Sequence, residues 1–319
     1  MFIMKADREK PAKVTVGIPK ALLYFKYFHL WESFFQTLGI NYIVSPDTNK
    51  DILNKGINYA VDEACLSSKI YLGHVAWLMG KCDYILVPRI SSFGKAGKVC
   101  TKFYAIYDLV MSTFTDSDFK LINYNIDSTN SENERKAFVK MGVALGKSKS
   151  QSLYAYIIAK QTQKTQLNII KNEQLKLLNK DGIKILIIAH RYTVLDKYIG
   201  EPIVRLLKQM GTTPIFGHVV DTKEALVRSE EISKTLPWLF NKELIGALAL
   251  YKDKVDGIIL MTTFPCGPDS LVNEVVIRKI KDKPILNLIL DGQEGTAGLE
   301  TRLESFIDII KFKRSDEID

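Results

Sequence analysis

The chain has 319 residues, of which 46% are hydrophobic and 25% are charged, a composition typical of a globular protein of about two domains. No apolar run reaches the ~18–20 residues of a membrane helix, and residues 1–11 lack the apolar core of a signal peptide. The net charge of +8 comes from scattered lysines without a basic block. We therefore expect a cytoplasmic protein with no membrane and no nucleic acid as partner.

Strands and helices alternate in the first part of the chain. Gly39 ends the first helix, as glycine commonly does, and Pro46-Asp47-Thr48 supplies acceptors that cap the next helix. A loop rich in glycine, serine and lysine is expected over 91–99. The predicted strands cover 13–18, 41–45, 84–88 and 120–124; the predicted helices run from Pro19 to about 38, from near 48, over about 64–79 and over about 100–113.

A long helical tract is predicted from about 132 to 179, because apolar residues recur there at helical spacing. It holds few residues suited to chemistry, so we interpret it as a connection between two lobes. A second array of strands and helices begins at Lys184. Its predicted strands cover 185–190, 213–217, 257–262 and 284–290, and its predicted helices cover about 201–210, 223–252 (two helices), 269–280 and 297–311.

Strands that alternate with helices predict parallel sheets with helices on both faces. We therefore predict an α/β fold with two Rossmann-like lobes, a long helical connection and a site in the cleft between the lobes. The predicted domains are a first lobe at 1–147 with Cys65 and Cys100, a connection at 148–182, and a second lobe at 183–319 with Cys266.

The four cysteines are far apart and form no CxxC pair. Disulfides are rare in cytoplasmic chains, which leaves buried thiols, a reactive thiol or metal ligands. Cys65, Cys100 and Cys266 each fall at a predicted helix start, near the strand ends where α/β proteins bind ligands. Unpaired N–H groups at a helix start lower a thiol pKa and can donate to cluster sulfides. Cys82 precedes a strand at the opposite edge, and we expect it to be structural.

Structural interpretations stand beside these functional ones. A free cysteine is commonly a small buried hydrophobe, so spacing alone favours a cluster site no more than a structural one. The glycine-rich segment 291–298 follows a strand, as phosphate-binding loops do, yet it lacks the GxGxxG order, and a tight turn that caps the last helix is favoured. His190 and His218 end strands and can face the cleft, although each is more often a satisfied polar residue than a ligand.

Several segments spread over nearly the whole chain resemble one protein family. They are 17–24, 45–50, 61–65, 87–89, 100–103, Phe264-Pro265-Cys266-Gly267-Pro268-Asp269-Ser270, 291–295, and 298–306 with Thr301-Arg302-Leu303-Glu304-Ser305-Phe306. On these segments the chain resembles acyl-CoA dehydratase activase-related proteins. That group belongs with the 2-hydroxyacyl-CoA dehydratase subunits and the double-cubane-cluster proteins.

The resemblance implies a [4Fe–4S] cluster held by Cys65, Cys100 and Cys266, with one iron left open. It also implies low-potential electrons from a separate ATP-dependent iron–sulfur activase. The chain has no GxxxxGK[ST] phosphate loop, so we do not expect it to be the ATPase itself. No acyl-CoA signature maps onto the chain, which leaves the substrate open, and a larger double cluster would need a second subunit.

Three functions follow as hypotheses. The leading one is an electron acceptor that reduces a small molecule or an acyl-CoA at the open iron, with Asp62, Glu63 and Lys102 beside the ligands to tune charge or move protons. Helix capping and surface ion pairs are a slightly favoured alternative for those three residues. The second function is a non-catalytic iron–sulfur relay or regulatory subunit. The third is a small-molecule or nucleotide binder without a cluster.

The first predicted helix carries more aromatic residues than one buried stripe needs. This surplus favours an oligomeric protein, with a homo- or hetero-oligomeric partner on that helix, although a thickly packed core would give the same pattern. The aromatic residues are Tyr24, Phe25, Tyr27, Phe28, Trp31, Phe34 and Phe35.

Overall fold

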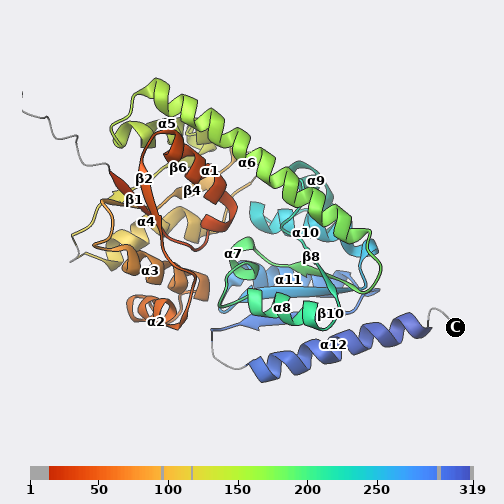
Figure 1. Ribbon diagram of the computed structural model, residues 1–319. Helices are drawn as coiled ribbons and strands as arrows, with labels where there is room; N and C mark the ends of the chain where they lie inside the picture. Colours follow the sequence, from red (N-terminus) through yellow and green to blue (C-terminus); the bar gives the residue numbers. More distant parts are fainter. Residues whose placement is uncertain (1–13, 95–96, 116–117, 293–295, 317–319) are drawn as a thin grey trace, which may run out of the picture.

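The computed structural model describes residues 14–94, 97–115, 118–292 and 296–316 (Figure 1). Two four-stranded parallel sheets dominate the fold, with strand orders β2-β1-β3-β5 and β10-β9-β7-β8. The strands are β1 (Thr15–Ile18), β2 (Asn41–Val44), β3 (Tyr84–Leu86), β4 (Arg89–Ser92), β5 (Leu121–Ile122), β6 (Asn125–Asp127), β7 (Lys184–Ile188), β8 (Thr213–Phe216), β9 (Gly257–Thr263) and β10 (Ile285–Leu290).

Helices follow nearly every strand and connect parallel neighbours, as the alternating pattern predicts. Before the second sheet they are α1 (Tyr24–Thr37), α2 (Lys50–Tyr59), α3 (Leu66–Leu78), α4 (Thr101–Thr113), α5 (Glu134–Ala144) and α6 (Lys149–Leu178). Around the second sheet they are α7 (Arg191–Val194), α8 (Glu201–Gln209), α9 (Thr222–Ile232), α10 (Leu239–Tyr251), α11 (Gly267–Lys279) and α12 (Thr296–Asp316). The predicted α/β class with Rossmann-like lobes is confirmed.

The two sheets share one layout. In each, the first strand in the chain lies between the second and the third, and the fourth lies beyond the third. Ligands of such sheets bind where the strand order reverses, outside the carboxyl ends of the first and third strands. In the second sheet that place lies between the ends of β7 and β9, so the residues just after these two strands are the candidates for a site.

Helices cover both faces of the second sheet because its strands are apolar on both sides. Ile185 and Ile187 of β7 pack on the face covered by α8 and α12. Leu186 and Ile188 pack on the opposite face, against α10 and α11. This alternation is the period of two of a strand buried on both faces.

The long tract predicted at 132–179 is two helices, which corrects the continuous helix expected from periodicity. Gly146 adopts a left-handed φ of 80° between α5 and α6, and Ser148 starts α6 with a capping box to Gln151. Figure 1 shows α6 as one long helix that runs from the first sheet across to the second. The domain boundaries at 147 and 183 remain a prediction.

A short parallel pair, β4 with β6, lies just after two predicted strands, and its Ser91 and Ser92 fall in the predicted loop 91–99. It continues the direction of β3 and β5 after a break at Val87 and Pro88. Proline has no N–H to donate to a strand ladder, so the first sheet ends there and a second pair begins.

The aromatic helix α1 is covered by the chain itself. Trp31, Phe34 and Phe35 are fully or almost fully buried, and α1 packs along α6 in addition to the sheet. Because α1 is covered by the sheet on one side and by α6 on another, a thickly packed core explains its many aromatic residues without a subunit interface. Within the described ranges, no helix is long and apolar enough to cross a membrane.

Candidate functional site

Cys65 is the N-cap residue of α3 and lies against the end of β9. The amide of Leu66 donates to the carbonyl of Phe264 at 2.9 Å, and the hydroxyls of Ser67 and Thr263 lie 3.0 Å apart. These contacts join the first sheet's helix to the second sheet's strand. They place Cys65 beside the segment that leads to Cys266.

Cys100 and Cys266 are the N-cap residues of α4 and α11. Neither sulfur accepts a capping hydrogen bond, although the amide of Lys102 favours the Cys100 thiolate and the amide of Asp269 favours the Cys266 thiolate. Three elements thus present a sulfur at a helix start, as the sequence predicts.

The three cysteines are close enough to influence one another electrostatically. Cys100 interacts with Cys65, and Cys266 interacts with both. Burial raises the pKa of Cys100 and Cys266 above the usual thiol value, and neighbouring Asp269 and the other thiols raise it further. The lowered pKa expected from the helix starts is wrong for these two thiols, because burial outweighs the influence of the helix-start amides.

A small cavity lies between the sheets at the reversal point of the second sheet. Cys100 and Cys266 line it, together with Phe103 from the first lobe and His190, Tyr192, Trp238, Phe240, Asn241, Pro268 and Asp269 from the second. Its volume is about 20 Å³, which is room for about one water molecule. The site that the sequence placed between the lobes is therefore small, and half of its lining side chains carry aromatic rings.

Asp269 organises the polar side of this cavity. Its Oδ1 atom lies 2.9 Å from Nε2 of His190 and accepts from the amide of Asn241 at 2.8 Å. Its Oδ2 atom accepts from the hydroxyl of Thr262 at 2.9 Å. Burial alone would raise the pKa of Asp269, but His190 and these hydrogen bonds hold it below its usual value. The carboxylate is therefore ionised and fully paired.

The donor set fits a thiolate-bound group better than a single metal ion. One ion binds each sulfur at about 2.3 Å, which requires the sulfurs to meet closely. Within the parts of the chain that the structure describes, no three His, Cys, Asp or Glu side chains meet that closely. Two thiols that line the cavity, Cys100 and Cys266, with Cys65 within electrostatic reach of both, are the ligand type of a larger iron–sulfur group. The cavity must widen to admit it.

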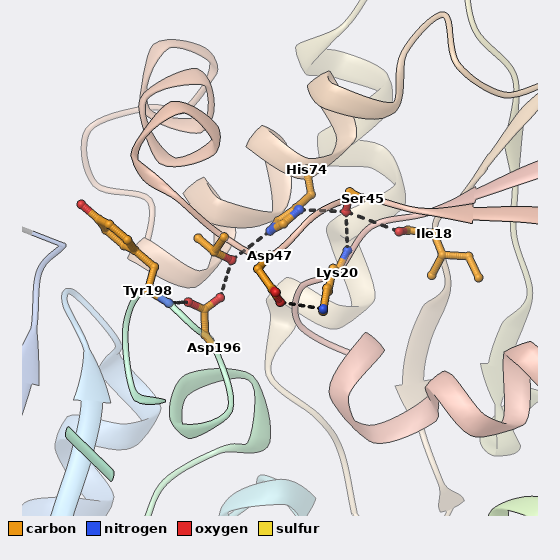
Figure 2. Close-up of polar contacts among 8 residues, drawn as sticks. Ile18, Lys20, Ser45, Asp47, His74, Asp196 and Tyr198 are labelled. Atoms are coloured by element: carbon orange, nitrogen blue, oxygen red, sulfur yellow. Dashed lines mark hydrogen bonds and ion pairs between the residues drawn. The ribbon is translucent and has the colours of Figure 1, made fainter. Parts of the chain in front are cut away.

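A second cluster of polar side chains joins the lobes away from the cysteines (Figure 2). His74 lies between two hydroxyls: Ser45 Oγ is 2.8 Å from Nδ1, and Thr48 Oγ1 is 3.0 Å from Nε2. Thr48 donates in turn to Oδ2 of Asp196, which follows α7 in the second lobe. All four side chains are buried. We name this Ser45–His74–Thr48–Asp196 series the polar chain.

Hydrogen-bond directions along the polar chain follow from its ends. Asp196 Oδ1 already accepts hydrogen bonds from the amides of Tyr198 and Ile199. Its Oδ2 accepts a hydrogen bond from the Thr48 hydroxyl. Thr48 must then accept from Nε2–H of His74, and Ser45 donates to Nδ1. Burial lowers the pKa of His74 to about 3, which agrees with a neutral ring that carries its proton on Nε2.

Sequence comparison identifies one protein family that this chain matches. A family model described as CoA enzyme activase uncharacterised domain (DUF2229) matches residues 15–220, well over half of the chain. The chain belongs to this family. The matched segment carries Cys65, Cys100, His190 and Tyr192, whereas Cys266 follows it. No curated protein matches the chain at a significant level.

The remaining described residues that the sequence analysis discusses lie outside the cavity. Cys82 packs below β1, at the edge opposite the cavity, where a Cβ on Gly17 would meet its sulfur. Asp62 and Glu63 are exposed beside Cys65, and the Asp62 carbonyl accepts from Lys69. His218 packs near Arg191, whose guanidinium donates to its carbonyl. Residues 293–295 of the glycine-rich segment lie outside the described residues.

Asp269 and Tyr192 are site residues that the sequence pattern did not predict. His190 is predicted to end a strand and to be able to face the cleft, and the structure places it in the cavity lining. A local signal existed, since His190-Arg191-Tyr192 follows β7 as Cys266 follows β9, and both strand ends border the reversal point. The partners of His190 could not be inferred, because Asp269 lies 79 positions further along the chain.

Proposed function

We propose that this chain is an iron–sulfur protein in which Cys65, Cys100 and Cys266 hold a [4Fe–4S] cluster. One observation supports the proposal above all others: three thiols from both lobes, each at a helix start, lie within mutual electrostatic reach. When bound, such a cluster supplies one-electron transfer at a potential set by its surroundings.

The chain's own residues prepare the site for a cationic group. Burial keeps Cys100 and Cys266 protonated in the free protein, since it raises both thiol pKa values. Thiolates form only when positive iron compensates the charge, so binding releases protons. The amides of Lys102 and Asp269 lower the pKa of Cys100 and Cys266 in part. They stabilise the thiolates once these have formed.

The electron source that we propose is an ATP-dependent iron–sulfur activase. The family description, CoA enzyme activase, supports a link to that system. The chain would accept low-potential electrons and pass them to a small molecule or an acyl-CoA at an iron that no cysteine ligates. Three cysteines leave one of four irons without a protein ligand.

Anaerobic purification with iron and sulfide quantitation tests the cluster. We expect about four irons per chain in wild type, loss of iron in Cys266→Ser, and retained iron in the control Cys82→Ser. Cys82 is a half-buried thiol on the far side of the first sheet. Wild type that stays free of iron after anaerobic reconstitution would overturn the proposal.

A second measurement separates an electron acceptor from a static relay or regulatory subunit. The loaded protein is mixed with an ATP-dependent activase, and its visible absorption is followed with and without ATP. Bleaching that requires ATP supports the electron acceptor. Re-oxidation on addition of an acyl-CoA or another small oxidant supports reduction at the cluster. Bleaching without any oxidant-dependent recovery favours the relay.

A further inference from the structure

Tyr192 stands at the centre of the cysteine site. It is the second residue of α7, directly after the end of β7, and it lines the cavity with Cys100 and Cys266. Its hydroxyl lies within electrostatic reach of Asp269 and of all three cysteines. A residue that neighbours ligands from both lobes also neighbours whatever those ligands hold.

The ring of Tyr192 is held on two sides. It stacks on His190 with centroids 4.9 Å apart and an angle of 17° between the planes. Phe103 from α4 meets it edge-on at 6.0 Å. His190 is itself fixed by Asp269. The contact between His190 and Asp269 therefore fixes the position of the Tyr192 ring and of its hydroxyl. His190 acts as a positioning residue.

The Tyr192 hydroxyl remains available as a hydrogen-bond donor. Throughout the described part of the chain, no side chain or backbone group forms a hydrogen bond with it. Burial, followed by the charges of Asp269 and the thiols, raises the phenol pKa well above its usual value, so the proton stays on oxygen. The hydroxyl is therefore free to donate to a group placed among the cysteines.

We propose that the Tyr192 hydroxyl donates a hydrogen bond to a sulfur of the group held by Cys65, Cys100 and Cys266. This inference rests on the proposed function. A donor to sulfur stabilises the more negative, reduced state of an iron–sulfur group and so raises its reduction potential. Tyr192 thereby makes the protein easier to reduce by its electron donor.

The test compares reconstituted wild type, Tyr192→Phe and the control Tyr71→Phe. Phenylalanine keeps the stacking on His190 and removes only the hydroxyl. Tyr71 is also a buried tyrosine whose hydroxyl lacks a partner, but it lines a separate cavity below α1. Iron per chain is measured first, and the midpoint potential is then taken from an anaerobic titration followed by visible absorption.

We expect equal iron in all three proteins and a more negative midpoint potential in Tyr192→Phe alone. Equal potentials in wild type and Tyr192→Phe, at equal iron content, would overturn the role of Tyr192 and leave the proposed function intact. A shift of the same size in Tyr71→Phe would also overturn it, because the effect would then not depend on the site. Wild type without iron would overturn the proposed function and this inference together.

Discussion

Asp196 sets the direction of hydrogen-bond donation along the polar chain. As a carboxylate it only accepts, so Thr48, His74 and Ser45 each donate toward it in turn. The donor and acceptor roles along the polar chain cannot reverse while Asp196 is ionised. A buried histidine with a single fixed tautomer is the result.

Replacement Asp196→Asn should reverse the polar chain without breaking it. The amide oxygen can still accept from Tyr198 and Ile199, while the amide N–H donates to Thr48. His74 must then carry its proton on Nδ1, and Ser45 turns its hydroxyl to the Ile18 carbonyl, 3.5 Å away. The nitrogen-15 shifts of the His74 ring measure the tautomer.

The matched variant Asp196→Ala removes the acceptor altogether. It leaves the Thr48 hydroxyl and two amides without a partner, and we expect it to cost about 1–3 kcal/mol for each such buried group. Asp196→Asn should change the free energy of unfolding by less than this range. An unchanged His74 tautomer in Asp196→Asn would contradict the assigned directions.

At the scale of elements, α2 and α3 determine where Cys65 lies. The two helices touch backbone to backbone at Gly56 and Gly73: a Cβ on Gly73 would come within 2.0 Å of the Ile52 carbonyl oxygen. Only glycine allows that approach. Because Cys65 caps α3, the depth at which α3 packs sets the position of its sulfur.

Gly73→Ala should therefore force the two helices apart. We expect the free energy of unfolding to fall by about 1–3 kcal/mol, as for other overpacked positions, measured by urea denaturation. Gly298→Ala is the control, since a Cβ there meets nothing within 4 Å and alanine favours a helix by about 1 kcal/mol. Equal urea midpoints for wild type and Gly73→Ala would show that α2 and α3 separate without cost.

The elements themselves could largely be predicted from local pattern. Apolar runs followed by helical spacing gave the order of β1 to β10 apart from the short β4 and β6, and the cysteines at three helix starts followed from the same pattern. Local pattern does not show burial, so the direction of the pKa shift at Cys100 and Cys266 was predicted wrongly. The contact between Thr48 and Asp196 spans 148 positions, and no spacing rule reaches that far.

At the scale of the whole molecule, separate contacts hold the lobes together around the cysteine site. The polar chain is one of them. Lys26 of α1 pairs with Glu243 of α10 at 2.7 Å and lies over the Phe240 ring. The amide of Leu239 donates to the Lys98 carbonyl, and α3 bonds to the end of β9. Together these contacts close the cavity from several sides.

Thr48→Val should loosen that closure. It leaves His74 and Asp196 without their shared partner, at a cost of about 1–3 kcal/mol in the closed form, which corresponds to a roughly 5–150-fold larger open population. We expect faster labelling of Cys100 and Cys266 by N-ethylmaleimide, quantified by mass spectrometry.

Cys82 lies outside the cavity and serves as an internal reference, because its labelling rate should not change. Thr212→Val is the control variant, since Thr212 bonds only within the second lobe, to the Leu207 carbonyl. Identical rates at Cys266 in wild type and Thr48→Val would show that the polar chain does not govern access.

The small size of the cavity has a consequence for the order of events in the life of the protein. A space for about one water molecule admits no larger guest once the lobes have met. The proposed iron–sulfur group would therefore have to arrive while the lobes are still apart, before the polar chain and the Lys26–Glu243 pair form. On the same reasoning, the proposed iron–sulfur form should yield its iron to a chelator only slowly, because release would have to wait for the lobes to part.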